Sequence, residues 1–276
     1  METYKGTMKI TFLGTGGAFA SAEQGQSNML IESDSGKKLL IDCGMTAPYQ
    51  LEKLGLTAND IDAVYISHLH ADHVGGMEWL GYMTYFTGDK KPELYCETNL
   101  MTQLWETTLQ GGMKTIKDND ATLETYFDCY PVKVDGLDIE SEDCFSWEGC
   151  VFDLIPLIHV HNKDNSVISY GLTIYEEATG RATYISTDTT AEESLPYIDS
   201  SDAFDVIFHE CEIGFVSGVH SPYDVLNTLD PDVKKKMWLY HYSNECDVEA
   251  DGFNGLVKTF DTFGLFTGER LTSTSK

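Results

Sequence analysis

The sequence predicts an α/β protein in which two mixed β-sheets pack face to face and helices cover them outside. Its 276 residues show a strand-rich first half, a helical middle and a second strand-rich half. Segments distributed in this way bury their apolar faces in stacked layers. No linker, repeat or low-complexity tract divides the chain, so we expect a single domain over residues 1–276 with a loose tail at 272–276.

The individual elements follow from apolar periodicity and turn residues. Strands are expected at residues 8–14, 28–33, 38–42, 61–67 and 93–96, with a hairpin turn at 33–36. Helical spacing predicts helices over 46–54, 76–87 and 97–110. The second half predicts several strands between 132 and 187, a hairpin at 177–180, and helices near 221–228 and 249–260.

The apolar runs of the second half end in side chains that can bind metals. The runs 152–159, 182–188, 204–210 and 237–241 finish at His159, at Asp188, at the pair His209–Glu210, and at His241. Strands that end in such residues gather distant side chains at one edge of a sheet. The sequence therefore predicts a site rather than a scatter of histidines.

The highest density of potential metal ligands is in the motif HLHADH, which contains His68, His70, Asp72 and His73. Alternation along an extended segment sends His68 and His70 to one side, and the following turn aims Asp72 and His73 at another point. Two adjacent metal ions are therefore more natural than one. Imidazole and carboxylate ligands without thiolate suit Zn²⁺, although Mn²⁺ or Fe would also fit.

Composition narrows the range of substrates and compartments. The chain has 45 acidic and 18 basic residues and a formal charge of −27, with no basic patch, so we expect no stable binding of nucleic acid. A small phosphodiester is repelled much less, because salt screens charges beyond about 8–10 Å. The seven cysteines show no CxxC spacing, no apolar run reaches the roughly 20 residues that a membrane requires, and the N-terminus is polar. We expect a cytoplasmic protein without membrane contact.

The order of these motifs resembles the metallo-β-lactamase superfamily, and specifically its ribonuclease Z-like phosphodiesterase branch. The similarity runs from about Met8 to Phe263 and includes FLGTGG at 12–17 and LIDCG at 40–44. It implies an αββα sandwich. It also implies a first zinc held by His68, His70 and a third histidine, a second held by Asp72, His73 and His241, and Asp188 bridging the two.

The third histidine and the residues behind the ligands leave alternatives open. His159 closes an apolar strand and is favoured as the third ligand, while His161 would line the pocket or lie in a surface loop. Asp42 is expected to orient a ligand histidine through its other ring nitrogen. The alternative is that Asp42 caps a turn before Gly44.

The same resemblance implies the acid of the reaction. His220 would protonate the leaving oxygen, Glu210 would hold its ring, and Asp72 would help to orient the nucleophile. Otherwise His220 is a loop residue before a helix that starts at Ser221. Among aromatic residues, weak candidates for contact with a nucleobase are Tyr223, Trp79 and Tyr242.

Segments 13–19, 73–80 and 217–241 are similar to the phage and bacterial anti-Pycsar proteins. This similarity implies zinc-dependent hydrolysis of 3′,5′-cyclic mononucleotides such as cUMP, cCMP, cAMP or cGMP to 5′-monophosphates, which would evade cyclic-nucleotide immune signalling. It also implies a homodimer, with helices between 76 and 110 as the dimer face, and the host cytoplasm if a phage encodes the chain. The alternatives are a tRNA 3′-processing nuclease, for which the usual insertion between the third histidine and Asp188 is absent, a lactone or thioester hydrolase, and a non-catalytic protein that sequesters a nucleotide.

Overall fold

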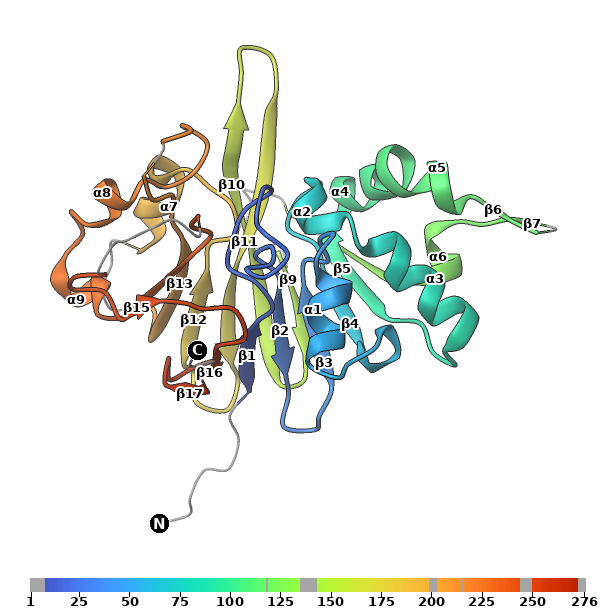
Figure 1. The fold of residues 1–276 in the computed structure, drawn as a ribbon, viewed down its shortest axis with the longest axis horizontal. Coiled ribbons are helices and arrows are strands. Elements are labelled where there is room, and N and C mark those ends of the chain that lie inside the picture. The colour runs from blue at the N-terminus through green and yellow to red at the C-terminus, as the bar shows by residue number, and fades with distance from the viewer. Residues whose placement is uncertain are drawn as a thin grey trace.

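The computed structural model describes residues 8–117, 119–134, 143–198, 203–214, 216–243 and 250–272. Two β-sheets lie face to face in the middle of the molecule, and helices cover the outer sides (Figure 1). Both sheets contain parallel and antiparallel pairs. The predicted αββα sandwich with mixed sheets is confirmed.

The first sheet has the strand order β17-β16-β1-β2-β3-β4-β5-β8 in the described part of the chain. Its strands are β1 (Lys9–Phe12), β2 (Met29–Glu32), β3 (Lys38–Ile41), β4 (Ala63–Tyr65), β5 (Glu93–Glu97), β8 (Asp128–Val132), β16 (Thr262–Gly264) and β17 (Arg270–Thr272). The neighbours β3, β4, β5 and β8 run parallel, so their carboxyl ends lie at one edge.

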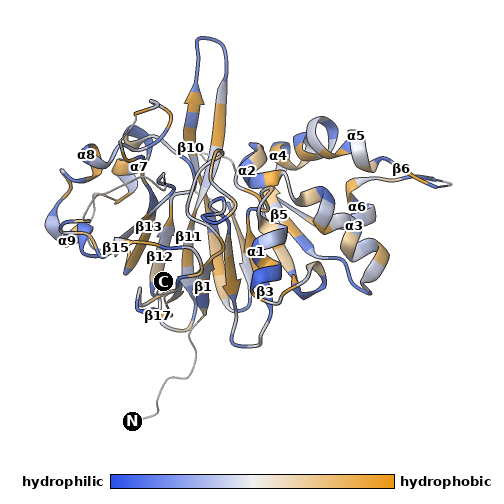
Figure 2. Cartoon of the chain, viewed as in Figure 1, coloured by the Kyte–Doolittle hydropathy of each residue, from blue (hydrophilic) through white to orange (hydrophobic). Residues whose placement is uncertain are grey.

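The second sheet has the order β15-β14-β13-β12-β11-β10-β9. Its strands are β9 (Cys144–Trp147), β10 (Cys150–His161), β11 (Ser166–Glu176), β12 (Ala182–Ile185), β13 (Val206–Glu210), β14 (Met237–Tyr240) and β15 (Gly255–Leu256). Strands β12, β13 and β14 are parallel. The long hairpin of β10 and β11 projects beyond the sheets, and its tip is hydrophilic (Figures 1 and 2).

The helices divide between the two outer sides (Figure 1). Beside the first sheet lie α1 (Ala47–Lys53), the 3₁₀ turn η1 (Ala58–Asp60), α2 (Ala71–Val74), α3 (Met77–Thr87), α4 (Thr98–Gln103), the π-helix η2 (Leu104–Leu109), α5 (Gln110–Met113) and α6 (Leu123–Tyr126). Beside the second lie α7 (Ala191–Ile198), α8 (Tyr223–Leu226) and α9 (Pro231–Lys234). A small hairpin of β6 (Thr115–Ile116) and β7 (Asn119–Asp120) extends from the first group.

Three apolar layers hold the sandwich together. Between the sheets, aromatic side chains from both interlock, with the rings of Phe12 and Phe208 5.2 Å apart and those of Tyr95 and Phe145 4.1 Å apart. Separate buried clusters join each sheet to its own helices. Burial of this apolar surface is the main force that fixes the strand ends in place.

Two expected helices differ from the structure. The helix predicted over 249–260 is wrong, because Gly252 and Gly255 have φ angles of +83° and +145° and Gly255–Leu256 forms β15 beside β14. The helix near 221–228 begins at Tyr223, with Pro222 rather than Ser221 as its N-cap. Of the tail at 272–276, Thr272 ends β17 and the remainder lies outside the described residues.

Among the residues that the structure describes, the helices are too short or too polar to cross a lipid bilayer.

Candidate active site

The carboxyl ends of parallel strands from both sheets bring the predicted site residues together. Asp42 follows β3, and His241 follows β14. Asp42, Thr187 and His241 have φ angles of +59°, +51° and +67°, which side-chain-bearing residues seldom adopt. Such strain is concentrated at functional sites, where the surrounding structure maintains it.

The loop that carries Asp72 and His73 is fixed by close packing. Buried Asn28 donates its side-chain amide to the Asp72 carbonyl (2.9 Å) and accepts from the Gly44 backbone N–H (3.0 Å). A Cβ at Gly44 would lie 1.9 Å from the Asp72 carbonyl oxygen, so only glycine fits there. Nothing in the local sequence around Asn28 indicates this role, which depends on the packing of β2 against the α2 loop.

The predicted ligands form two groups, each with ligand atoms within 4.8 Å of one another. One group contains His68, His70 and His159, and the other contains Asp72, His73, Asp188 and His241. The Oδ2 atom of Asp188 lies 3.2 Å from His73 Nε2, 3.3 Å from His241 Nε2 and 3.8 Å from His159 Nε2. Asp188 therefore sits between the two groups.

Hydrogen bonds hold the ring nitrogens that face away from the cluster. His73 Nδ1 lies 2.7 Å from Asp42 Oδ2, and Asp42 Oδ1 accepts from the Ser67 backbone N–H at 2.8 Å. His159 Nδ1 lies 2.9 Å from the Val219 carbonyl oxygen. These contacts favour the tautomer in which Nδ1 carries the proton, which leaves Nε2 facing the other ligands. Asp42 thus contacts His73 and Ser67 instead of serving only as a turn cap.

Burial sets the protonation of the first group. It lowers the pKa values of His68, His70 and His159 below the ordinary value for histidine, which favours the neutral form that binds metals. Burial would also lower the pKa of His73, but the carboxylates of Asp188 and Asp42 outweigh it and raise that pKa well above the ordinary value. The carboxylates therefore concentrate negative charge where a cation would lie.

The donor set fits one or two divalent ions. Asp188 Oδ1 and His241 Nε2 are buried and have no hydrogen-bond partner among the described residues. Polar atoms in that condition cost free energy unless a ligand satisfies them. Nitrogen and carboxylate donors without sulfur are the donors of hydrolytic Zn²⁺ sites and also suit Mn²⁺ or Fe.

His220 and Glu210 lie beside this cluster. Glu210 Oε1 accepts from the Ser221 backbone N–H (2.7 Å), and Glu210 Oε2 lies 3.4 Å from His220 Nδ1. Burial lowers the pKa of His220, but the ion pair with Glu210 outweighs it and raises the pKa to about 9. The His220 ring packs 4.9 Å from the His159 ring and 4.4 Å from the His241 ring.

Several predicted candidates lie elsewhere. His161 is exposed on the β10–β11 hairpin, where its Nδ1 is 2.9 Å from Ser166 Oγ, and it does not join the cluster. His209 points to Ser194 on the other face of β13 and has a structural role. The structure therefore brings His159, and not His161, to the metal-binding candidates.

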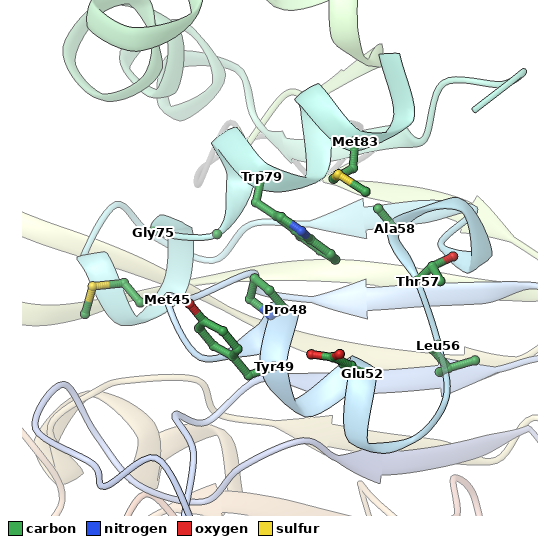
Figure 3. Close-up of a pocket in the computed structure, with 11 residues that line it drawn as sticks. Met45, Pro48, Tyr49, Glu52, Leu56, Thr57, Ala58, Gly75, Trp79 and Met83 are labelled. Carbon is green, nitrogen blue, oxygen red and sulfur yellow. The ribbon is translucent and has the colours of Figure 1, made fainter. Parts of the chain in front are cut away.

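The aromatic candidates do not contact the cluster either. Trp79 lines a separate cavity of about 460 Å³ between α1 and α3, together with Tyr49 and Met83 (Figure 3). Tyr223 packs against Phe253, with ring centroids 5.7 Å apart. The Tyr242 hydroxyl donates to the Val257 carbonyl.

The same fold occurs in solved structures of low sequence identity. The metallo-β-lactamase fold protein YhfI from Bacillus subtilis superposes with a TM-score of 0.69 at 20% identity, covering 93% of this chain and 99% of that chain. The fold is thus the metallo-β-lactamase fold.

The chain belongs to the Anti-Pycsar protein Apyc1 family, whose model matches residues 8–263. An Anti-Pycsar protein Apyc1 from Paenibacillus harenae is 36% identical over 240 residues, which cover 87% of this chain and 92% of that protein. Another from Bacillus phage 010DV004 is 31% identical over 245 residues, which cover 87% of this chain and 91% of that protein. Membership of this family, together with the fold, places the protein among the metal-dependent phosphodiesterases.

Proposed function

We propose that the protein hydrolyses 3′,5′-cyclic mononucleotides to nucleoside 5′-monophosphates with two Zn²⁺ ions, and that it thereby removes a cyclic-nucleotide immune signal. The observation that carries this proposal is the position of the Glu210–His220 pair beside the two ligand groups. A phosphodiester needs a proton for the departing alkoxide, whereas acyl transfer from a lactone does not depend on this pair. Family membership supports the same substrate class.

The residues of the candidate active site would have separate roles in the reaction. His68, His70 and His159 would hold one ion, Asp72, His73 and His241 the other, and Asp188 both. When bound, the ions supply positive charge that stabilises the phosphoryl oxygens and activates the attacking water. Asp72 would orient that water, whose oxygen forms the new bond to phosphorus. His220, held by Glu210, would donate a proton to O3′ as the P–O3′ bond breaks.

The charge of the chain favours a small substrate. A formal charge of −27 opposes the many phosphate contacts that a tRNA requires. A cyclic mononucleotide carries a single negative charge. Because salt screens the distant charges of the protein, it experiences mainly the electrostatic field near the site. The electrostatics therefore support the cyclic nucleotide over tRNA processing.

The proposal is tested with the zinc-loaded protein and a panel of cUMP, cCMP, cAMP and cGMP, with products resolved by chromatography. Release of 5′-monophosphates that stops on chelation and resumes on addition of zinc is expected. An inert panel, together with turnover of a lactone, a thioester or a tRNA precursor, would overturn the proposal.

We expect Phe19 to contact the base of the substrate. Its side chain is fully exposed on a turn in which the Ala20 N–H donates to the Gly17 carbonyl (3.0 Å), and Gly17 packs against His241. Stacking of a base on an aromatic ring is worth about 1–3 kcal/mol, so Phe19→Ala should raise KM about 5- to 100-fold with little change in kcat. Steady-state kinetics on the preferred cyclic nucleotide measure this effect. Tyr175→Ala, an exposed aromatic at the far end of β11, is the control, and an unchanged KM for Phe19→Ala contradicts the role.

We also propose that the protein acts as a homodimer through α3, which lies within the helices between 76 and 110 that the sequence indicates as the dimer face. The exposed apolar side chains of α3 include Met83, Tyr85 and Phe86, and the rings of Tyr85 and Phe86 lie 4.9 Å apart. Gathered apolar residues on a surface are typical of interfaces. Light scattering after size exclusion measures the mass, and a monomer at all concentrations would exclude this arrangement.

A further inference from the structure

Gly17 lies against the imidazole of His241, in the loop that also carries Phe19. A Cβ atom at residue 17 would stand 2.7 Å from Cε1 and 3.0 Å from Nε2 of that ring. Gly17 is not among the residues with positive φ, so alanine would be acceptable to its backbone. The close approach to His241, rather than a special conformation, is what requires glycine here.

The ring of His241 has little room to retreat from a methyl group. Its Nδ1 edge faces Glu210 Oε2 at 3.8 Å, its Nε2 edge faces Asp188 at 3.3 Å, and the ring of His220 packs 4.4 Å away. A side chain at residue 17 would therefore push the imidazole out of place and move its Nε2 atom, which is the atom expected to bind the metal ion.

The backbone of His241 is held by the same loop. The Tyr242 N–H donates to the Thr15 carbonyl (3.1 Å), and the Gln24 side-chain amide donates to the Tyr242 carbonyl (2.6 Å). These bonds anchor the segment that keeps His241 at a φ of +67°. Because the backbone is anchored, crowding at residue 17 falls on the side chain.

We propose that Gly17 is a positioning residue, which keeps the Nε2 edge of His241 open for a metal ion. The inference rests on the proposed role of His241 as a ligand of the second ion. Residues that orient metal ligands typically change metal affinity about 10- to 100-fold when they are substituted. We expect a loss of this size for one of the two bound ions in Gly17→Ala, with the other retained.

The test measures zinc per chain after dialysis against buffered zinc, and the visible absorption spectrum of the Co²⁺-substituted protein. Wild type should hold two equivalents, and Gly17→Ala about one, with an altered Co²⁺ spectrum. Two controls separate steric contact from general damage. In Gly112→Ala the new Cβ crowds only the carboxylate of Glu78 on α3, outside the ligand groups, and in Gly111→Ala it meets nothing within 4 Å. Both should retain two equivalents and the wild-type spectrum.

A double variant tests whether Gly17 acts through the histidine. In a His241→Ala background, Gly17→Ala should cause no further loss of metal. Two tightly bound equivalents and an unchanged spectrum in Gly17→Ala, or an equal loss in Gly112→Ala, would overturn the role of Gly17. A wild-type protein that binds no metal would instead remove the proposed function, so the two failures are distinguishable.

Discussion

Replacing Asp188 by asparagine should reduce cyclic-nucleotide hydrolysis about a thousandfold. Asparagine has nearly the same shape as aspartate, but it lacks the negative charge. In the wild-type protein that charge, on Asp188 Oδ2, faces the Nε2 atoms of His73, His241 and His159. A bound metal ion supplies several kcal/mol of transition-state charge stabilisation, and each 1.36 kcal/mol that is lost is a factor of ten in rate. The pKa of the Asp188 carboxyl group depends on the same neighbouring histidines. Burial would raise it, but His241 and His73 outweigh burial and hold it well below its ordinary value.

The measurement combines kcat/KM with zinc content, because the carboxylate is expected to serve both ions. Asp188→Asn should retain at most one equivalent of zinc per chain. Asp205→Asn is the matched control, since Asp205 is exposed and immediately precedes β13, at the opposite end from Glu210. Full activity and two equivalents of zinc in Asp188→Asn would refute a bridging role.

The position of the cluster was predictable because strand ends and ligands coincide in the sequence. The apolar runs before Asp188, Glu210 and His241 are buried strands, and parallel pairing brings their carboxyl ends to one edge. The sequence alone cannot specify the contacts of Asn28 or Gly17, because both depend on segments that are distant in the chain. Ser67 was easier to predict as a residue of the site, because it directly precedes His68 in the sequence. In the structure its hydroxyl donates to Asp42.

The choice between His159 and His161 shows where periodicity fails. Regular alternation along β10 would place both side chains on one face. The register against β11 shifts between Ile158 and Val160, and such an irregularity breaks the alternation. His159 is therefore buried at the cluster, while His161 is exposed on the hairpin.

The helix expected over 249–260 failed for a related reason. Phe253, Leu256, Val257 and Phe260 have helical spacing, but two glycines with positive φ interrupt them. Glycine within a periodic segment lowers helix propensity by about 1 kcal/mol, and here pairing with β14 prevails. Val257 donates its N–H to the Leu239 carbonyl, so the segment extends the second sheet.

Substituting His220 by alanine should reduce hydrolysis of the preferred cyclic nucleotide about 10²- to 10⁴-fold, the usual contribution of a general acid. The reason is the leaving group, since a ribose 3′-alkoxide is a strong base and needs a proton as it departs. Zinc content should remain at two equivalents, because the proposed ligand sets do not include His220. Glu210→Gln should weaken the ion pair at His220 Nδ1 and lower the activity less than His220→Ala does.

The leaving group separates acid catalysis from a merely structural role. In bis(p-nitrophenyl) phosphate the departing nitrophenolate is a weak base and needs no proton from the protein. If His220 acts as the acid, His220→Ala should lose far less activity on this activated diester than on the cyclic nucleotide. An equal loss on both substrates would mean that His220 only supports the neighbouring rings of His159 and His241, and the leaving oxygen would then take its proton from another group.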